Sequence, residues 1–145
     1  MAQLNASVRV IGKHPEKLNR CEKWAIKHRL LEDLTPRKDQ DIVVDCTGSA
    51  RGLALAMQLV RPRGRIVLKT TVADQEGVDL SPLVIDEIEL IGSRCGPFDE
   101  ALELLNTDAV DVLSLISRRT KLDNGVEALR TASQGDVIKV LMEVD

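Results

Sequence analysis

The sequence predicts an α/β fold in which a mostly parallel sheet carries helices on both faces. Residues 42–46 (IVVDC) and 65–71 (RIVLKTT) are apolar runs of strand length, as in parallel strands that are covered on both sides. The segment between them, residues 50–60, has the composition of a helix and ends at the turn Arg61-Pro62-Arg63-Gly64. Strands that alternate with helices through short loops are the units from which such sheets are built.

The N-terminal part of the chain predicts another strand and helix. Residues 7–11 (SVRVI) form a β-branched run that stops at Gly12, which is typical of a strand. A helix is expected over residues 14–31, because Pro15 suits a first helical turn and apolar residues recur on one face. Those apolar residues are Leu18, Cys21 and Ala25. The polar residues 32–41 are expected to form a loop.

The C-terminal part continues with shorter elements. A strand is expected at residues 87–92 (EIELIG), a helix at 98–105 (FDEALELL) and an extended segment at 112–122. A further helix is expected at residues 124–133, with Asp123 as its N-cap. The chain should end in a strand with an apolar face formed by Ile138, Val140, Met142 and Val144.

The composition argues against several classes of protein. A chain of 145 residues suffices for one domain with a core, and its net charge of -3 and two aromatic residues do not suit a nucleic-acid partner. No apolar run approaches the ~18 residues of a membrane span, and the N-terminus does not resemble a secretory signal. Three widely spaced cysteines favour reduced thiols in the cytoplasm. With two histidines and no CxxC motif, no zinc site is expected within the chain.

Small, polar and basic residues follow the expected strands. In open α/β sheets ligands bind beyond the carboxyl ends of the strands, and small residues with free backbone amides let an anion approach closely. The alternative is that these strands simply end in polar turns. The candidate groups are Gly12-Lys13-His14, Thr47-Gly48-Ser49, Lys69-Thr70-Thr71 and Ser93-Arg94-Cys95.

The first of these groups bears on the choice of cofactor. A carboxylate at this strand end would accept hydrogen bonds from the ribose hydroxyls of NAD, whereas Gly12 has no charge to repel a 2′-phosphate. Lys13, Lys17 and His14 would add positive charge, so the sequence favours NADP, with NAD as the second choice. The alternative is a solvated basic turn at the start of a helix.

Two cysteines and one carboxylate could be taken for reactive groups. Cys46 has no histidine near it in the sequence and is expected to be a buried, inert thiol. Cys95 lies beside Arg94, which could lower its pKa, but packing or a backbone contact is favoured. Asp45 could be a catalytic acid, although a strand-end carboxylate that bonds to the backbone is more common.

Together these segments resemble the zinc-type, medium-chain alcohol dehydrogenase family. VRVIGKHPEKL (8–18) is similar to the second strand of that family's nucleotide domain and the turn that follows it. Residues 43–71 resemble its fourth strand, helix and fifth strand, and ELIGSRCGPFDEALELL (89–105) its sixth strand and the return toward the catalytic domain. ISRRTKLDNG and the residues after it (116–144) resemble its C-terminal helix and basic strand. The resemblance runs over nearly the whole chain in the family's order.

The resemblance implies a fold, a division into domains and roles for the candidate residues. It implies a partial Rossmann-like, dinucleotide-binding domain at residues 1–92 and a return segment at 93–145. Three groups of residues would meet the cofactor: Gly12, Lys13 and Lys17 at the adenosine ribose; Thr47, with Gly48 after it, beside the adenine; and Lys69, Thr70 and Thr71 along the nicotinamide. Ser93, Arg94 and Cys95 would lie near the carboxamide and the substrate cleft, and Lys139 near the pyrophosphate, unless Lys139 is only solvated.

The same resemblance implies what lies outside this sequence. The family's zinc-holding domain, the first strand of its nucleotide domain and the glycine-rich turn are expected to precede residue 1, so zinc belongs to the intact enzyme only. Because the family dimerises through its sixth strand, the strand Glu89–Gly92 is the expected interface of a homodimer.

Three functions remain open at this point. The first is the cofactor-binding part of an NAD(P)-dependent alcohol or polyol dehydrogenase, a truncated form that is inactive alone. The second is a non-enzymatic remnant that associates with itself through a strand edge. The third is another nucleotide-binding α/β protein, such as a methyltransferase, although no acidic residue ends the strand at Gly12 to hold a ribose.

Overall fold

The computed structural model describes residues 6–72 and 77–144, which divide into two compact units. The second unit is the continuous segment Thr35–Gly96. The first unit combines the segment up to Leu34 with the segment that begins at Pro97. Within each unit strands alternate with helices, and every pair of neighbouring strands is parallel. The predicted α/β, Rossmann-like class is therefore confirmed.

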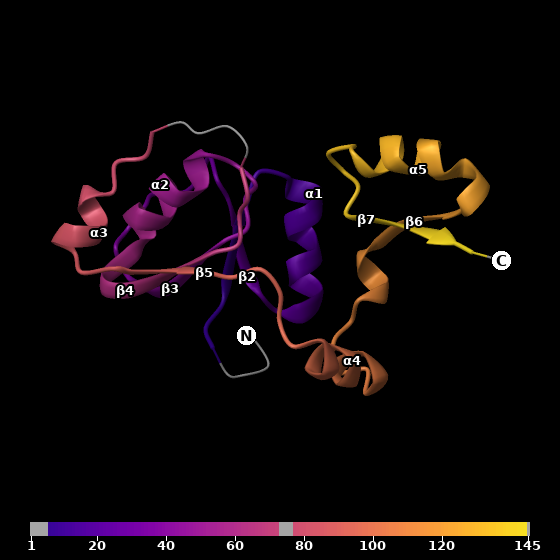
Figure 1. Ribbon diagram of the computed structural model, residues 1–145, viewed down its shortest axis with the longest axis horizontal. Helices are drawn as coiled ribbons and strands as arrows, with labels where there is room; N and C mark the ends of the chain where they lie inside the picture. Colours follow the sequence, from indigo (N-terminus) through magenta and orange to yellow (C-terminus); the bar gives the residue numbers. More distant parts are fainter. Residues whose placement is uncertain (1–5, 73–76, 145) are drawn as a thin grey trace. The chain divides into compact units, whose positions relative to one another are not determined.

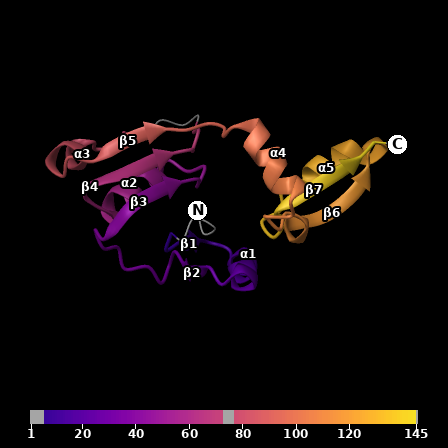
Figure 2. The ribbon, with the colours of Figure 1, turned by 90° about the horizontal axis from the view of Figure 1, so that it is seen from below.

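The second unit contains a three-stranded parallel sheet in the order β3-β4-β5 (Figures 1 and 2). Its strands are β3 (Gln40–Asp45), β4 (Val60–Leu68) and β5 (Glu89–Gly92). The connections contain the helices α2 (Arg51–Leu59) and α3 (Ser81–Ile85). Each connection joins parallel strands, which is why each needs a crossover helix rather than a tight turn.

The core of this unit lies between the sheet and α2. Val43 of β3 pairs with Ile66 of β4, so these two side chains share one face of the sheet. Ile66 is fully buried there against Ala56 and Met57 of α2, together with Val60. Alternation then places Asp45, two residues after Val43, on the same covered face, where it is 3% exposed.

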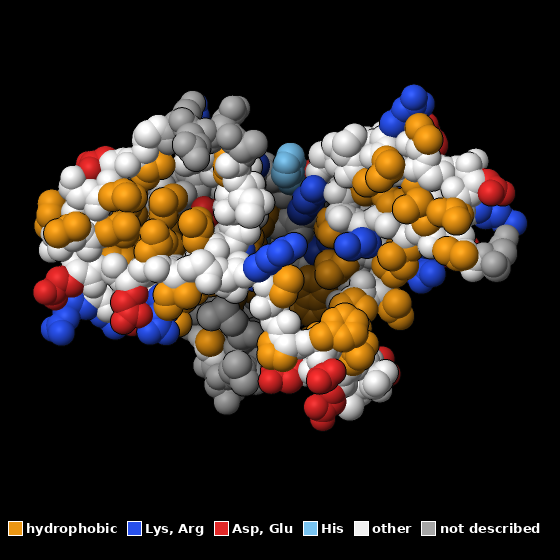
Figure 3. Space-filling view, viewed as in Figure 1, with side chains coloured by type: hydrophobic (Ala, Val, Ile, Leu, Met, Phe, Trp, Pro, Cys, Tyr) orange, Lys and Arg blue, Asp and Glu red, His pale blue; other side chains and the backbone are white. Residues whose placement is uncertain are grey.

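The opposite face of the same sheet is apolar and accessible. Ile42, Val44 and Ile91 alternate with the core residues and are about 40% exposed, with individual values of 44%, 38% and 41%. Hydrophobic side chains are also exposed on α3, where Val84 and Ile85 are 80% and 77% exposed (Figure 3).

The N-terminal segment of the first unit differs from the predicted long helix. The strand β1 (Arg9–Gly12) is followed by a single turn α1 (Pro15–Leu18) and a 3₁₀ helix η2 (Asn19–Trp24). Ala25 then adopts a left-handed conformation with φ of 52°, which ends the helix. A second strand, β2 (Lys27–Leu30), follows and pairs in parallel with β1. The expected helix over residues 14–31 is therefore wrong after residue 24.

The C-terminal segment contains a further parallel pair, β6 and β7, with α5 between them. Its elements are α4 (Phe98–Asn106), η3 (Leu113–Leu115), β6 (Ile116–Lys121), η4 (Leu122–Asn124), α5 (Gly125–Ala132) and β7 (Lys139–Glu143). The N-cap of α5 is Asn124 without a side-chain hydrogen bond, so the predicted Asp123 cap is wrong. Asp123 instead lies within the 3₁₀ turn that precedes the helix.

Polar contacts join the two segments of the first unit. Lys23 Nζ lies 2.6 Å from Asp111 Oδ2, and the Arg20 guanidinium donates to the carbonyl oxygen of Ser114. His14 Cε1 lies 3.5 Å from the position that a Cβ atom at Gly135 would occupy. In the ranges that the structure describes, no helix has the length and apolar character that crossing a membrane requires.

Candidate cofactor site

The ends of β3 and β4 are connected through Thr70. Its hydroxyl Oγ1 donates to Asp45 Oδ1 at 2.9 Å and accepts the backbone N–H of Gly48 at 3.2 Å. The N–H of Lys69 donates to the carbonyl oxygen of Asp45 at 2.9 Å, which extends the pairing of the two strands. Two of the predicted groups, those that begin at Thr47 and Lys69, are therefore brought together at the carboxyl edge of the sheet.

The buried carboxylate of Asp45 accepts hydrogen bonds from residues at this edge of the sheet. Its Oδ1 also accepts the N–H of Thr47 at 2.9 Å, so the expected backbone bond of this carboxylate is confirmed. Gly52, in the first turn of α2, leaves no room for a side chain, because a Cβ there would lie 2.5 Å from Asp45 Oδ1 and would also overlap Thr47 Oγ1. Asp45 Oδ2 is buried and has no hydrogen-bond partner among the described residues. The role of Gly52 was missed, although its place just after a Thr-Gly pair was a signal.

The end of β5 is joined to the end of β4 by Lys69. The N–H of Ser93 donates to the carbonyl oxygen of Leu68 at 3.0 Å. Lys69 Nζ donates to Ser93 Oγ at 3.3 Å, to the Ser93 carbonyl oxygen at 3.5 Å and to the Arg94 carbonyl oxygen at 3.1 Å. A third predicted group therefore lies beside the second, and the second unit presents one continuous polar edge.

Several of the predicted residues at this edge are open to solvent. Gly48 has φ of +63°, a conformation that favours glycine, and nothing lies within 4 Å of its Cβ position. Thr71, Arg94 and Cys95 are exposed. An edge with cations, hydroxyls and an open glycine can hold a polar, anionic ligand.

The remaining predicted residues belong to the first unit. Gly12 ends β1, and a Cβ there would lie 3.1 Å from Leu18 Cδ2, so packing of α1 also favours glycine. Lys13 and His14 are exposed, and His14 Nδ1 lies 3.6 Å from Glu16 Oε1. Lys17 is half-buried in α1, and Lys139 is exposed at the start of β7.

The cysteines differ partly from expectation. Cys46 is exposed, not buried, because Asp45 takes the covered face of β3 and the next residue points the other way. Cys21 is buried, and this burial raises the pKa of its thiol. Over the described ranges, no three His, Cys, Asp or Glu side chains gather in a way that could hold a metal ion. The donor sets of those ranges therefore do not fit a zinc site.

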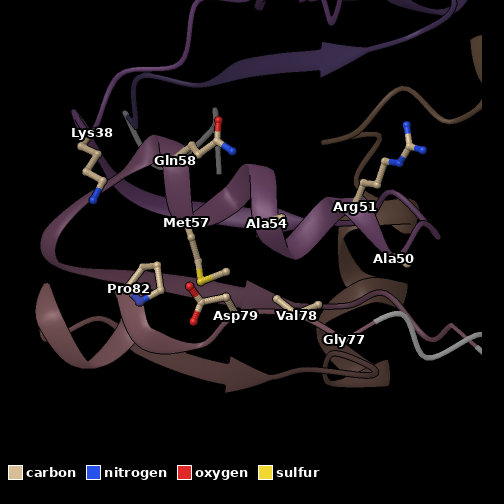
Figure 4. Close-up of a pocket in the computed structure, with 10 residues that line it drawn as sticks. All are labelled: Lys38, Ala50, Arg51, Ala54, Met57, Gln58, Gly77, Val78, Asp79 and Pro82. Carbon is tan, nitrogen blue, oxygen red and sulfur yellow. The ribbon is translucent and has the colours of Figure 1, made fainter.

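A cavity of about 330 Å³ lies between α2 and the segment before α3 (Figure 4). Met57, Ala54 and Val78 provide its apolar lining, and Lys38 and Arg51 are its basic residues. None of the predicted cofactor-binding residues lines it. We assign the chemistry to the strand ends instead, because they hold the polar groups that the fold brings together.

The sequence matches the zinc-binding dehydrogenase family over residues 2–107, and the chain belongs to that family. Human sorbitol dehydrogenase is 24% identical over 107 residues, which are 72% of this chain and 30% of that protein. D-arabitol-phosphate dehydrogenase of Enterococcus avium is 27% identical over 119 residues, 79% of this chain and 34% of that protein. The chain thus spans about a third of the length of these relatives.

Solved structures share the fold. L-idonate 5-dehydrogenase of Escherichia coli superposes with a TM-score of 0.87 at 19% identity, over 96% of this chain and 43% of that one. A zinc-binding dehydrogenase of Sinorhizobium meliloti bound to NADP gives a TM-score of 0.83 at 19% identity, over 96% and 45% of the two chains. An alcohol dehydrogenase of Escherichia coli complexed with NADH gives 0.79 at 18% identity, over 95% and 44%.

Proposed function

We propose that this chain is the cofactor-binding part of an NAD(P)-dependent alcohol or polyol dehydrogenase. The observation that carries the proposal is the polar edge at the ends of β3, β4 and β5, where Thr70 ties the Gly48 loop to β4. In open α/β sheets this edge is where dinucleotides bind. Membership of the zinc-binding dehydrogenase family and structural neighbours that carry NADP or NADH support the same assignment.

We infer a division of labour among the predicted residues. Thr47 and Gly48 would lie beside the adenine, and Lys69, Thr70 and Thr71 along the nicotinamide, with Ser93, Arg94 and Cys95 near the carboxamide. Gly12, Lys13, His14 and Lys17 would surround the adenosine ribose, and Lys139 would meet the pyrophosphate. The basic residues after Gly12 and the missing carboxylate favour NADP over NAD.

When bound, the nicotinamide would exchange a hydride with the carbon of an alcohol or polyol. This chain's residues would orient the nicotinamide ring and hold the phosphates. We expect catalysis to require the zinc-holding part of the family's full-length enzymes, toward which residues 93–145 would return, so the chain alone should turn over no alcohol. The exposed thiols of Cys46 and Cys95 favour a cytoplasmic location.

Titration of the purified chain with NADPH and NADH, followed by nucleotide fluorescence, tests the proposal. NADPH should bind more tightly than NADH. Lys13→Met should weaken NADPH binding about tenfold, the factor that corresponds to 1.4 kcal/mol. Lys27→Met is the matched control, because Lys27 is also exposed but begins β2, opposite the start of β1.

The Gly12→Asp variant tests the cofactor preference directly. The nearest atoms to the new Cβ are those of the buried Leu18 side chain, at 3.1 Å and beyond, so this side chain has to shift by a few tenths of an ångström, and circular dichroism should show that the variant still folds. Its carboxylate should reverse the preference toward NADH. If the wild-type chain binds neither nucleotide, the cofactor proposal is wrong.

A second candidate function, a module that associates with itself, is favoured by the outer edge of β5, which pairs with no other strand in the described part of the chain. Leu90 is 39% exposed. The N–H of Ser93 points to β4, so alternation directs the N–H groups of Leu90 and Gly92 to the outer edge. We propose that two copies pair there as a homodimer.

The Leu90→Pro variant tests this interface. It removes one outward donor without removing a bond to β4. Sedimentation should change from dimer to monomer, while circular dichroism keeps its β signal. An unchanged sedimentation coefficient would contradict the interface at Glu89–Gly92. A dimer that binds no nucleotide would favour the second function.

A further inference from the structure

The positive charges of the second unit are distributed unevenly along its strands. Toward the amino ends of the strands, several cations form ion pairs: Lys38 with Asp86, Arg61 with Asp41, Arg63 with Glu87 and Arg65 with Glu89. At the carboxyl edge, Lys69 and Arg94 have no carboxylate within ion-pair distance among the described residues. Among the described residues, the edge proposed to face the cofactor therefore carries positive charge without a paired carboxylate.

Lys69 is held in place by neutral acceptors. Its ammonium donates to one hydroxyl and two carbonyl oxygens at the end of β5, at 3.1 to 3.5 Å. These three contacts restrict a side chain that would otherwise move freely in solvent, and they leave its charge intact. An ammonium that is positioned but not neutralised is suited to an anionic ligand.

Arg94 lies at the same point of the sheet. Its carbonyl oxygen accepts the 3.1 Å hydrogen bond of Lys69 Nζ, so the backbone of Arg94 lies beside the ammonium, and its exposed side chain starts from this point. A guanidinium and an ammonium together can satisfy the two charges of a phosphate monoester better than either alone. The only carboxylate described at this edge, Asp45, is buried beneath it and accepts hydrogen bonds from Thr47 and Thr70.

We infer that Lys69 and Arg94 form an anion subsite that selects phosphorylated polyols over neutral ones. The inference rests on the proposed function, in which these residues lie near the nicotinamide and the substrate cleft. The same charges could instead contact a phosphate group of the cofactor, so the test has to separate the two sources of phosphate.

The test is a titration of the ¹⁵N-labelled full chain with sorbitol 6-phosphate and with sorbitol, followed by amide chemical shifts. Sorbitol 6-phosphate should shift the amides of Lys69, Ser93 and Arg94 and bind at least about tenfold more tightly than sorbitol. Lys69→Met and Arg94→Met should each weaken its binding about tenfold. Arg61→Met is the matched control, because it removes an exposed cation from the opposite end of β4 and should change nothing.

NADPH titrations of the same variants identify the source of the phosphate. The loss of affinity for sorbitol 6-phosphate should exceed the loss for NADPH. An equal or larger loss of affinity for NADPH would overturn the inference. Chemical shift changes confined to other amides would also overturn it. So would a loss of sorbitol 6-phosphate affinity in Arg61→Met as large as that in Lys69→Met. If the chain binds sorbitol 6-phosphate through both cations but binds no nucleotide, the subsite stands and the proposed cofactor function fails.

Discussion

Thr70 Oγ1 donates a 2.9 Å hydrogen bond to Asp45 Oδ1, and this bond links two strand ends at the candidate cofactor site. Asp45 is 3% exposed, so Oδ1 has no ready access to water if the donor is removed. We predict that Thr70→Val lowers the free energy of unfolding by about 1–3 kcal/mol, the cost of leaving a buried acceptor short of a donor. Urea denaturation, monitored by circular dichroism, measures this change in the free energy of unfolding.

Thr70→Ser is the control for this prediction. It keeps the hydroxyl and removes only a methyl group, so its stability should lie much closer to that of the wild-type chain. A loss in Thr70→Ser as large as in Thr70→Val would contradict the prediction, because serine keeps the hydroxyl that makes the hydrogen bond.

Gly52→Ala is predicted to destabilise the chain, although alanine normally favours a helix over glycine by roughly 0.5–1 kcal/mol. The new Cβ would lie 2.5 Å from Asp45 Oδ1 and 2.6 Å from Asp45 Oδ2, so the helix or the carboxylate has to move. Overpacking of this kind costs about 1–3 kcal/mol. The midpoint of thermal unfolding should fall.

Gly125→Ala in the first turn of α5 is the matched control. The nearest atom to its Cβ position is Met142 Sδ at 3.7 Å, an ordinary contact, so this variant should be neutral or slightly stabilising. An unfolding midpoint of Gly52→Ala that rises as much as that of Gly125→Ala would contradict the predicted clash.

The ion pair between Lys23 and Asp111 predicts a dependence of stability on pH. The hydrogen bond from Lys23, together with hydrogen bonds from Ser114, lowers the pKa of Asp111 to about 2. Because this value lies below the unfolded pKa of about 3.9, the contribution is complete above pH ~4 and is lost as the pH falls to about 2. Asp111→Asn should therefore be less stable than the wild-type chain at pH 6, and the difference should shrink as the pH falls from about 4 to about 2.

Unfolding midpoints of the two chains at several pH values measure this difference. Lys23→Met should show the same convergence, because it removes the largest cause of the lowered pKa of Asp111. A difference between wild type and Asp111→Asn that stays constant down to pH 2 would contradict the assignment.

The three thiols should differ in their rates of alkylation. Cys46 and Cys95 are exposed, whereas Cys21 is buried and its pKa is raised by that burial. Iodoacetamide at pH 8 should therefore modify Cys46 and Cys95 first and Cys21 only slowly in the folded chain. Peptide mass spectrometry gives the three rates, and denaturation in urea should make them similar. Fast modification of Cys21 in the folded chain would be inconsistent with the structure.

The sheet of the second unit could be predicted because its sequence is locally unambiguous. The apolar runs that became β3 and β4 flank an amphipathic helix, and each signal agrees with the next. The helix expected after Pro15 failed for a tertiary reason. Residues after Ala25 keep helix-compatible composition, but Ile26, His28 and Leu30 alternate as in a strand, and pairing with β1 outweighs propensity.

The sequence predicted where the residues of the candidate site lie, but not which contacts they make with one another. The rule for strand ends located the groups at Thr47, Lys69 and Ser93, and the structure brings these three together. The sequence could not show that the Thr70 hydroxyl serves both Asp45 and Gly48, because such a bond depends on the spacing of two strands. Nor could it show which face of β3 is covered, which is why the exposure of Cys46 was missed.

The division of the chain has a consequence for its synthesis. The second unit is one uninterrupted segment, Thr35–Gly96, whereas the first needs residues from both sides of it. Because translation is sequential, the β3-β4-β5 sheet can form once Gly96 has left the ribosome. The ion pair between Lys23 and Asp111 can form only after Asp111 has also left the ribosome. Nascent chains arrested far enough beyond residue 96 for Gly96 to have left the exit tunnel should already carry a protease-resistant second unit.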